Sequence, residues 1–592
     1  ASGILADAIG KQYPIAMIDE FQDTDLLQYR IFSTLYPDNP QRGLFMIGDP
    51  KQAIYGFRGA DIFTYIKARR EVADHYTLET NWRSSRPMIL GVNRLFKHSP
   101  SPFIYNDDIP FLPYTDLLEK TFLAKCGYSI LDNLPALVEN IPGCWKIRID
   151  YRHTVMRMFL DNYVEPMHKW CTHHNLPLTG HLSGDEGSML SSICRFSAAM
   201  PFYEHEDIPG IDDFLAGMAD NGYMCEPFNE LGYSMIVLCK QVSSVANQLK
   251  NGLCSSEVLT SLGWGVPVSR QMAQIRFQQG LGINMIVPHD YSYSTAGDTK
   301  RDHPASYFFQ QPWFKENRVL HYAGARTSRL VSRGRCAARV AVLNPVTSGW
   351  AALDGERLAE HFKCRFPAKY PDTQYLEKSF AEISLLLLRN HIDFEYIDEE
   401  LLARYKKSGG LTIGEKSYDI LLLPPMTNIQ KTTLETIAGS GCKVIQIGKG
   451  AVLVNGKEAT VKFPSIEMNE LKNMQFASPL LDFYGSEETL LHSRDVDGQL
   501  EYFLVNFSEK TEEVKINSEI ANYVLYDPVG NCIISDNGNF PLIFSYICTI
   551  FPLILISSPL NGKSTQISSK SKFKINGPGP RGAEIPSLRL SN

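Results

Sequence analysis

The chain has 592 residues, of which 44% are hydrophobic and 21% charged, and its formal net charge is −7. This composition predicts several globular domains with large cores, and it excludes both a disordered chain and a protein that coats nucleic acid through bulk positive charge. The twelve cysteines lie between Cys126 and Cys548 without any Cys-x-x-Cys pair. Neither a zinc ribbon nor a disulfide framework is therefore predicted, and we expect reduced thiols.

The N-terminal segment lacks a basic stretch followed by a long apolar run, so a secretion signal is expected to be either absent or cut off before this sequence begins. The cytoplasm is the default compartment on this pattern. Residues 540–560 carry no charge and are followed by several lysines, which satisfies the length criterion for a membrane span. Three prolines in that stretch favour a pair of buried strands or a sequence that is not native coding, so membrane contact is not expected.

Two apolar runs near the N-terminus, Ile15–Ile18 and Leu44–Ile47, each end at a carboxylate. This pattern predicts parallel strands with Asp19, Glu20 and Asp49 at their carboxyl ends. An Asp-Glu pair in that position suits hydrolysis of a nucleoside triphosphate, with Asp19 holding Mg²⁺ and Glu20 polarising the attacking water.

Further motifs follow this pair within a short stretch. They are Gly48-Asp49-Pro50-Lys51-Gln52, Tyr55-Gly56-Phe57-Arg58-Gly59-Ala60-Asp61 and Thr80-Asn81-Trp82-Arg83-Ser84. Residues 10–110 thereby resemble the UvrD/RecB-type helicases. The resemblance implies a RecA-like fragment that uses Mg²⁺ and ATP and binds DNA. It implies that Gln52 senses the γ-phosphate, that Arg83 contacts it, and that Tyr55, Phe57 and Trp82 couple the nucleotide site to stacked bases. Arg58 is a further residue of these helicase motifs.

ATP hydrolysis by this segment is not expected, because the Gly-x-x-x-x-Gly-Lys-Ser/Thr phosphate loop should precede Asp19 and is not found there. Gly562-Lys563-Ser564 fits that loop only superficially. The later helicase motifs are not recognisable either.

Beyond residue 112 the pattern changes. Residues 112–335 alternate helical stretches such as Thr154–His173 with short apolar runs such as Leu178–His181 and Asn284–His289, which predicts part of a (β/α) barrel.

Residues 336–451 contain four apolar runs separated by helical stretches, which predicts a flavodoxin-like doubly wound parallel sheet. The expected strands are Arg339–Leu343, Phe394–Ile397, Asp419–Leu423 and Lys443–Ile447. Residues 452–540 show short alternating strands with Asp-Gly and Asn-Gly turns, for example Leu500–Phe507 after Asp497-Gly498, which predicts a β-sandwich-like accessory domain.

Several motifs of this second part occur in a recognisable order. They include Asn162-Tyr163-Val164-Glu165-Pro166, Thr179-Gly180-His181-Leu182-Ser183-Gly184-Asp185-Glu186, Ile208-Pro209-Gly210-Ile211-Asp212, Ser256-Glu257, Gly263-Trp264, Val287-Pro288-His289-Asp290 and Tyr526-Asp527-Pro528-Val529-Gly530. Residues 113–535 resemble the bacterial glycoside hydrolases grouped with α-L-rhamnosidases. The resemblance implies an oligosaccharide or glycoside substrate, a calcium ion in some members, and proteins that are often exported.

Glycoside cleavage usually employs two carboxylates, so acids at strand ends are the candidates. Glu257 is the first choice and Glu186 the second. His181 and Asp185 are candidate contacts to sugar hydroxyls or to a metal ion, His289 is a further candidate to face the substrate pocket, and Trp264 could provide an aromatic floor for the ring. The alternatives are that the glutamates cap helices and that the histidines are core residues with satisfied hydrogen bonds.

The expected organisation is therefore an α/β multidomain chain of two dissimilar parts. Residues 1–111 are a RecA-like helicase fragment, 112–335 a partial (β/α)-barrel hydrolase domain, 336–451 a doubly wound domain, 452–540 a β-rich domain, and 541–592 an apolar segment with a Ser/Lys/Gly-rich tail. The early barrel strands are expected before residue 113, where helicase sequence stands instead. Half a barrel would expose strand edges and could lack one catalytic acid.

Three functions remain open on this basis. The first is a glycoside hydrolase, active or inactive, joined to a helicase fragment. The second is a RecB-like helicase/exonuclease subunit with a foreign C-terminal part. The third is a carbohydrate-binding protein without catalysis.

Overall fold

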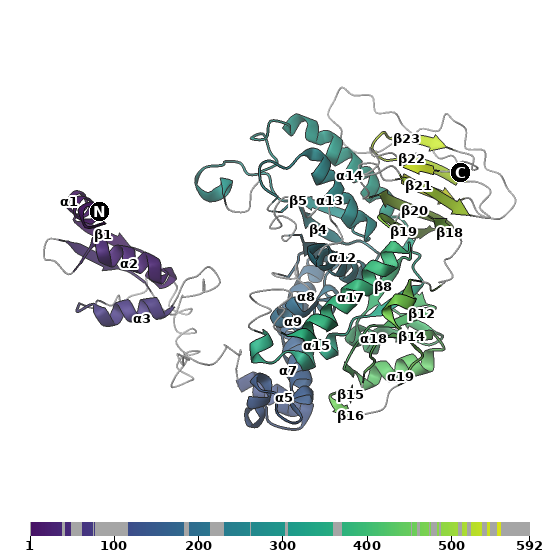
Figure 1. Ribbon diagram of the computed structural model, residues 1–592, viewed down its shortest axis with the longest axis horizontal. Coiled ribbons are helices and arrows are strands. Elements are labelled where there is room, and N and C mark those ends of the chain that lie inside the picture. The colour runs from purple at the N-terminus through teal and green to yellow at the C-terminus, as the bar shows by residue number, and fades with distance from the viewer. Residues whose placement is uncertain are drawn as a thin grey trace. The chain divides into compact units, whose positions relative to one another are not determined.

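The computed structural model places most of the chain in two compact units, Ala1–Leu112 and Pro113–Asn592 (Figure 1). Each unit is described by itself. The residues described are 2–37, 42–48, 62–74, 76, 116–182, 189–213, 230–260, 262–301, 306–358, 370–451, 453–458, 462–472, 474, 482–484, 487–506, 512–517, 523–535, 542–544 and 553–557.

The first unit contains a two-stranded parallel sheet and three helices. Its elements are α1 (Ser2–Gln12), β1 (Ile15–Ile18), α2 (Leu26–Leu35), β2 (Gly43–Met46) and α3 (Ile62–Glu71). The two strands pair from Ile15↔Gly43 to Ile18↔Met46, so both predicted strands are confirmed, the second beginning one residue earlier than expected.

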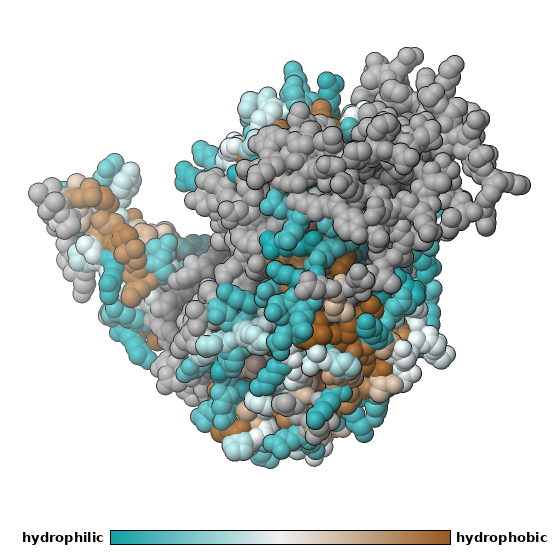
Figure 2. All heavy atoms as spheres, turned by 45° about the vertical axis from the view of Figure 1, so that its right-hand side comes forward, coloured by the Kyte–Doolittle hydropathy of each residue, from teal (hydrophilic) through white to brown (hydrophobic). Residues whose placement is uncertain are grey.

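The small core of this unit is formed by Phe21, Tyr29 and Ala68, with the ring of Phe21 edge-on to that of Tyr29. The sheet itself is poorly covered, since Ile15 is 61% exposed and Met17 is 69% exposed. Apolar side chains on the surface of this unit are visible in Figure 2. Parallel sheets are normally buried on both faces, so this sheet lacks part of its usual cover among the residues described.

The second unit begins with helices. They are α5 (Asp116–Cys126), α6 (Pro135–Val138), α7 (Cys144–Phe159), a π-helical turn (Leu160–Val164), α8 (Glu165–His173), α9 (Met189–Phe196) and α10 (Met200–Tyr203). The helix predicted over Thr154–His173 is thus present as the end of α7, the π turn and α8.

Strands and helices then alternate as the sequence predicts. The order is β3 (Gly210–Asp212), α12 (Glu230–Leu249), β4 (Ser255–Val258), α13 (Val268–Gly280), β5 (Met285–Pro288) and α14 (Asn317–Val331). The three strands are parallel neighbours, and an isolated parallel bridge from Thr179 to Ile208 adds the run predicted at Leu178–His181. The strands described form an open arc of a (β/α) arrangement and no closed barrel.

Helix α12 lies at the centre of the second unit. From Ser234 to Gln248 all of its side chains are buried, including the polar ones. The apolar run from Met235 to Cys239 places hydrophobic side chains on every side of this helix, and such a helix is stable only in the interior of a protein. It supports the strands that carry the candidate site.

A five-stranded parallel sheet follows. Its strands are β7 (Val340–Leu343), β8 (Phe394–Ile397), β12 (Ile420–Leu423), β14 (Lys443–Ile447) and β17 (Ser465–Ile466). Their spatial order is β17-β14-β12-β7-β8. Numbered along the chain this is 2-1-3-4-5, which is one of the two common orders of doubly wound sheets. All four strands predicted in this region are confirmed.

Helices and short strands surround this sheet. They are α15 (Val346–Ala352), α17 (Pro371–Arg389), α18 (Glu399–Tyr405), α19 (Lys431–Ser440), α20 (Met468–Leu471), β9 (Lys406–Lys407), β10 (Leu411–Ile413), β11 (Lys416–Tyr418), β13 (Asn428–Ile429), β15 (Leu453–Val454) and β16 (Lys457–Glu458).

The C-terminal part contains two antiparallel sheets. One has the order β23-β22-β25-β20-β19-β6 and the other β18-β21-β24. Their strands are β6 (Arg335–Cys336), β18 (Asp482–Tyr484), β19 (Thr489–Val496), β20 (Gln499–Asn506), β21 (Glu512–Asn517), β22 (Tyr523–Asp527), β23 (Cys532–Ser535), β24 (Leu542–Phe544) and β25 (Leu553–Ser557).

The turn between β19 and β20 is the predicted Asp497-Gly498 turn, with φ of 57° and 82°. Positive φ at both central residues is the signature of a type I′ hairpin. The boundary expected at residue 540 is too early, because β25 pairs with both β20 and β22. Its β-branched and leucine residues form an inner strand, and the described part of the uncharged 540–560 segment is strand. Among the residues described, no helix is long and apolar enough to cross a membrane.

One continuous core joins the three parts of the second unit. It includes Val242 of α12, Phe380 of α17, Leu422 of β12 and Phe503 of β20. The arc of strands, the doubly wound sheet and the hairpin are therefore held together by shared apolar burial.

Candidate active site at the carboxyl ends of the parallel strands

The candidate site is built around Glu257 of β4. In the parallel register Glu257 lies between Asp212 of β3 and Val287 of β5. Carboxyl ends of parallel strands meet at one edge of the sheet, so side chains that follow each strand converge there. Sequence reasoning placed Glu257, His181 and His289 at such ends.

The structure brings these three residues together. Nε2 of His181 is 3.2 Å from Oε2 of Glu257, and Nε2 of His289 is 3.8 Å from Oε1 of the same carboxylate. The side chains are 32%, 27% and 27% exposed for His181, Glu257 and His289. The carboxylate is thus held between two imidazoles while one side stays open to solvent.

The hydrogen bond from His181 lowers the pKa of Glu257, burial acts in the opposite direction, and the charges of His289 and His181 lower the pKa further. Glu257 is consequently ionised at neutral pH. Nδ1 of His181 also lies 3.4 Å from the carbonyl oxygen of Leu182, so both ring nitrogens face oxygen acceptors.

Asp212 is a member of this site that sequence reasoning missed. Its donor atoms lie within 4.8 Å of those of His181 and Glu257, and its Oδ1 accepts a hydrogen bond of 3.1 Å from Thr260 Oγ1. The sequence does place Asp212 directly after Ile211 and before a second carboxylate, Asp213. The apolar segment before it is too short to be recognised as a strand, so Asp212 is not identified as an acid at a strand end.

Asp213 lies behind the site and is fully buried. It accepts hydrogen bonds from the backbone of Leu259 and Thr260 and from the amides of Gln274 and Gln278. Burial raises the pKa of Asp213 to about 8, the neighbouring Asp212 raises it as well, and the backbone hydrogen bonds lower it. The hydrogen bonds of Asp213 thus connect the end of β3 to the residues that follow β4 and to α13.

Two glycines allow His181 to approach β3. A Cβ at Gly210 would lie 2.1 Å from the carbonyl oxygen of Gly180, so only glycine fits there. Glu206 lies beside these two glycines, and its Oε2 accepts a hydrogen bond of 3.2 Å from the backbone N–H of Gly210. Burial raises the pKa of Glu206 to about 8, against the opposing hydrogen bond from Gly210 and the charge of His181.

No contact within the described residues joins Trp264, which was predicted to lie beneath the sugar ring, to Glu257. Nε1 of Trp264 donates to the carbonyl oxygen of Lys300 at 2.9 Å, and the ring is partly exposed. Asp185 and Glu186 lie outside the described residues, so their predicted roles remain predictions.

His181, Asp212 and Glu257 also offer three possible metal ligands within 4.8 Å. An imidazole nitrogen among the donors does not suit calcium, which prefers a full set of oxygens. The calcium ion expected from the family resemblance therefore has no support at this trio.

In the first unit Asp19 and Glu20 follow β1 directly, as predicted. Glu20 N donates to Asp19 Oδ1 at 3.0 Å, and Glu20 Oε2 accepts from Gln22 Nε2 at 2.7 Å. Glu20 has φ of 50°, which turns the chain sharply after the strand. The other helicase residues lie outside the described residues, namely Asp49, Gln52, Tyr55, Arg58, Trp82 and Arg83.

A cavity of about 190 Å³ lies apart from this site, beside β12 and β14. It is lined by residues including Leu423, Met426, Gln446 and Lys462, with neither carboxylate nor histidine in the described lining. Gln446 fills part of it and donates to the carbonyl oxygens of Leu423 and Pro424. The described lining of this cavity therefore offers no acid–imidazole pair.

Comparison with known proteins gives two kinds of match, one in sequence and one in fold. Residues 2–73 match the UvrD/REP helicase N-terminal domain. The RecBCD enzyme subunit RecB of Escherichia coli is 58% identical over 110 residues, which are 19% of this chain and 9% of that protein. RecB of Haemophilus influenzae is 47% identical over 163 residues, 23% of this chain and 14% of that protein. The chain thus spans a small fraction of these relatives.

Solved structures of similar fold are glycoside hydrolases. A rhamnosidase from Novosphingobium sp. PP1Y has a TM-score of 0.52 at 16% identity, covering 75% of this chain and 43% of that one. A β-galactosidase from Bacillus circulans sp. alkalophilus has a TM-score of 0.52 at 11% identity, covering 94% and 96%. At such identities the likeness shows the fold alone. The chain therefore combines a RecB-like N-terminal segment with a glycosidase-like fold.

Proposed function

We propose that the second unit is a glycoside hydrolase of the α-L-rhamnosidase-like kind, with Glu257 as a catalytic carboxylate. The observation that carries this proposal is the position of Glu257 at the carboxyl end of the middle strand of β3, β4 and β5, where His181 keeps it ionised. The glycosidase folds that resemble this chain support the assignment. One of them, a β-galactosidase from G. stearothermophilus that is 12% identical, is described as a catalytic mutant in which a glutamate was replaced by alanine.

An ionised carboxylate can attack the anomeric carbon or activate a water, and a second acid must protonate the leaving oxygen. Glu186 is the partner that the sequence predicts. Asp212 is a second candidate, since its oxygens lie within 4.8 Å of the Glu257 oxygens. Glycosidase pairs whose carboxyl groups lie roughly 5–5.5 Å apart retain configuration, and more widely spaced pairs invert it. A pair formed by Asp212 and Glu257 would belong to the closely spaced, retaining kind.

The direct test is release of nitrophenol from aryl α-L-rhamnosides and aryl β-D-galactosides. We expect Glu257→Gln to lower kcat/KM by about 10²- to 10⁴-fold, because the charge that supports the oxocarbenium-like transition state is removed. The matched control is Glu382→Gln, an exposed glutamate in α17, which should retain full activity.

Full activity in Glu257→Gln would overturn the assignment of Glu257. If neither substrate is cleaved but either sugar raises the melting temperature of the chain, the second unit is a carbohydrate-binding protein without catalysis, which is the third function that the sequence left open.

The second candidate function is that of an ATP-dependent DNA helicase or exonuclease subunit. The 58% identity to RecB over 110 residues favours it. Under this proposal Asp19 would hold Mg²⁺, for which a carboxylate at a strand end is a suitable ligand, and Glu20 would activate water. ATP hydrolysis that is stimulated by DNA, lost in Glu20→Gln and retained in Asp74→Asn would support it. Absence of hydrolysis in all three proteins would reject it for this chain.

A further inference from the structure

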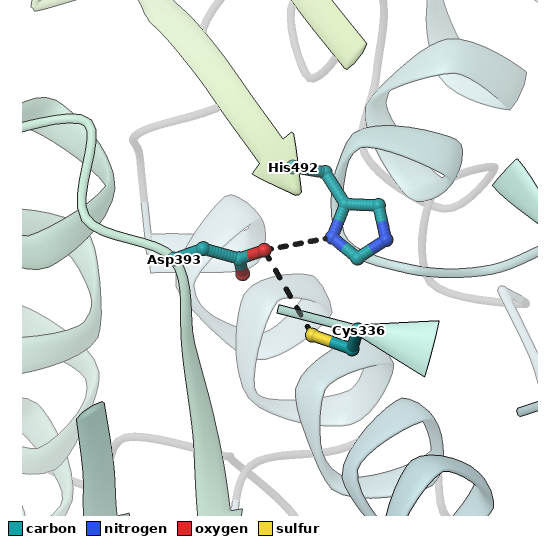
Figure 3. A group of neighbouring side chains, drawn as sticks. All are labelled: Cys336, Asp393 and His492. Atoms are coloured by element: carbon teal, nitrogen blue, oxygen red, sulfur yellow. Dashed lines mark hydrogen bonds and ion pairs between the residues drawn. The ribbon is translucent and has the colours of Figure 1, made fainter. Parts of the chain in front are cut away.

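A second cluster of metal-ligand side chains is buried where three parts of the second unit meet (Figure 3). Cys336 belongs to β6, Asp393 immediately precedes β8, and His492 lies in β19. Their exposed fractions are 4%, 8% and 1%. None of these residues contributes to the site at Glu257.

The donor atoms of the three side chains point toward one another (Figure 3). Nδ1 of His492 is 3.0 Å from Oδ2 of Asp393, Sγ of Cys336 is 3.9 Å from the same oxygen, and all three atoms lie within 4.8 Å. Ligand bonds of about 2.0–2.3 Å in a tetrahedral zinc site imply distances of roughly 3.2–3.8 Å between ligand atoms. The cluster needs only small adjustments to reach that geometry.

The imidazole of His492 is poorly satisfied by protein groups. Its Nδ1 lies 3.0 Å from Oδ2 of Asp393, whereas its Nε2 has no hydrogen-bond partner within the described structure. A buried ring nitrogen without a partner loses its hydration without compensation. With the ring proton on Nε2, Nδ1 presents its lone pair to a metal ion beside Asp393.

The carboxylate is already oriented by its neighbours. Nζ of Lys240 in α12 binds Oδ1 at 2.8 Å, and both the backbone N–H and the hydroxyl of Ser493 donate to Oδ2, at 2.9 and 3.1 Å. Such outer contacts are what fix the ligands of metal sites in proteins. They leave Oδ2 facing Cys336 and His492.

We propose that Cys336, Asp393 and His492 form a binding site for a divalent transition-metal ion of the zinc class. Sulfur, imidazole nitrogen and carboxylate oxygen together are donors that zinc accepts and that calcium and magnesium disfavour. The Cys336 thiol releases its proton to solvent as the bond from Sγ to the metal forms, and a water occupies the fourth position. The ion links β6, β8 and β19, so its role is to fasten the β-rich part to the doubly wound part.

The test is cobalt and zinc binding by the full chain. We expect one equivalent of Co²⁺ to produce the thiolate-to-cobalt absorption band, and Zn²⁺ to displace it. Cys336→Ser should abolish the band, and His492→Gln should weaken metal affinity by at least about tenfold. Both ions should raise the melting temperature of the wild type, because they bind only the folded state.

Two matched variants control for other donors. Cys194→Ser removes a buried cysteine of α9 that is not part of the cluster, and Glu257→Gln removes a donor from the trio with His181 and Asp212, which contains no sulfur. Both should retain the band and the stoichiometry. A wild-type chain without the band, or a Cys336→Ser chain that keeps it, would overturn the proposal. If Cys336→Ser fails to fold, the presence or absence of the band in the wild type decides.

Discussion

At the scale of single residues, the contact between His181 and Glu257 sets the charge of the candidate catalytic group. Glu257 is only partly buried, and burial alone would raise the pKa of its carboxyl. The hydrogen bond from His181 and the nearby imidazole of His289 outweigh that effect. A carboxylate whose folded-state pKa is lowered stays ionised to more acidic pH than a free glutamate.

This arrangement predicts a pH effect for His181→Ala. The substitution removes the hydrogen bond that is the main cause of the lowered pKa, so the pKa of Glu257 should rise toward its ordinary value. If glycosidase activity requires ionised Glu257, the acidic limb of the kcat/KM profile should move to higher pH. The profile, measured on wild type and variant with an aryl glycoside, checks this.

His168→Ala is a suitable control, since His168 contacts Asp207 rather than Glu257. It should leave the acidic limb in place. An unchanged limb in His181→Ala would mean that another group governs the profile.

At the scale of elements, the site depends on the close approach of the Thr179–His181 segment to β3. The parallel bridge from Thr179 to Ile208 and the glycines at 180 and 210 allow this approach. Because side chains alternate along a strand, the register also decides that Asp212 faces the same side as Glu257. A shift of one residue would turn Asp212 away.

We therefore expect Gly210→Ala to destabilise the second unit by roughly 1–3 kcal/mol, because the added Cβ overpacks against the Gly180 carbonyl. It should also move His181 away from Glu257 and lower any glycosidase activity. Denaturant unfolding together with the activity assay measures both effects.

The matched control is Gly439→Ala in α19, where a Cβ would meet no atom within 4 Å. Alanine is the better helix former, so this variant should be stabilised by about 0.5–1 kcal/mol. Equal behaviour of the two variants would contradict the close-approach argument.

At the scale of the whole molecule, the two units differ in how well they are packed. In the described part of the first unit few apolar side chains are buried, and its two-stranded sheet exposes Ile15, Met17 and Phe45. The second unit has one extensive core. Small, incompletely covered units are marginally stable, and exposed apolar faces promote association.

The full chain should consequently unfold in two thermal transitions, the first unit melting at the lower temperature. Phe21→Ala should abolish or lower the first transition only. Phe380→Ala should lower the second only, since loss of a buried phenylalanine costs about 3–5 kcal/mol. Differential scanning calorimetry distinguishes these outcomes, and a single transition shifted by both variants would show that the units unfold together.

The local features of this protein can be predicted from the order of its amino acids. The strands at Ile15–Ile18, Phe394–Ile397 and Lys443–Ile447 were predicted with their observed bounds, because each is an apolar run ended by polar or turn residues. The Asp497-Gly498 turn was predicted because two adjacent residues must adopt positive φ. The two family resemblances were also legible, since they rest on ordered motifs.

The contacts between distant residues, in contrast, depend on how the whole unit packs. The contacts of Glu257 with His181 and His289, the register that adds Asp212, and the convergence of Cys336, Asp393 and His492 all join segments distant in sequence. β25 lies within residues 540–560, where strands are expected, but its place between β20 and β22 is decided by pairing and not by its own pattern. The hydrophobic periodicity of a segment indicates which of its own side chains are buried. Which buried faces come together depends on packing across the whole unit.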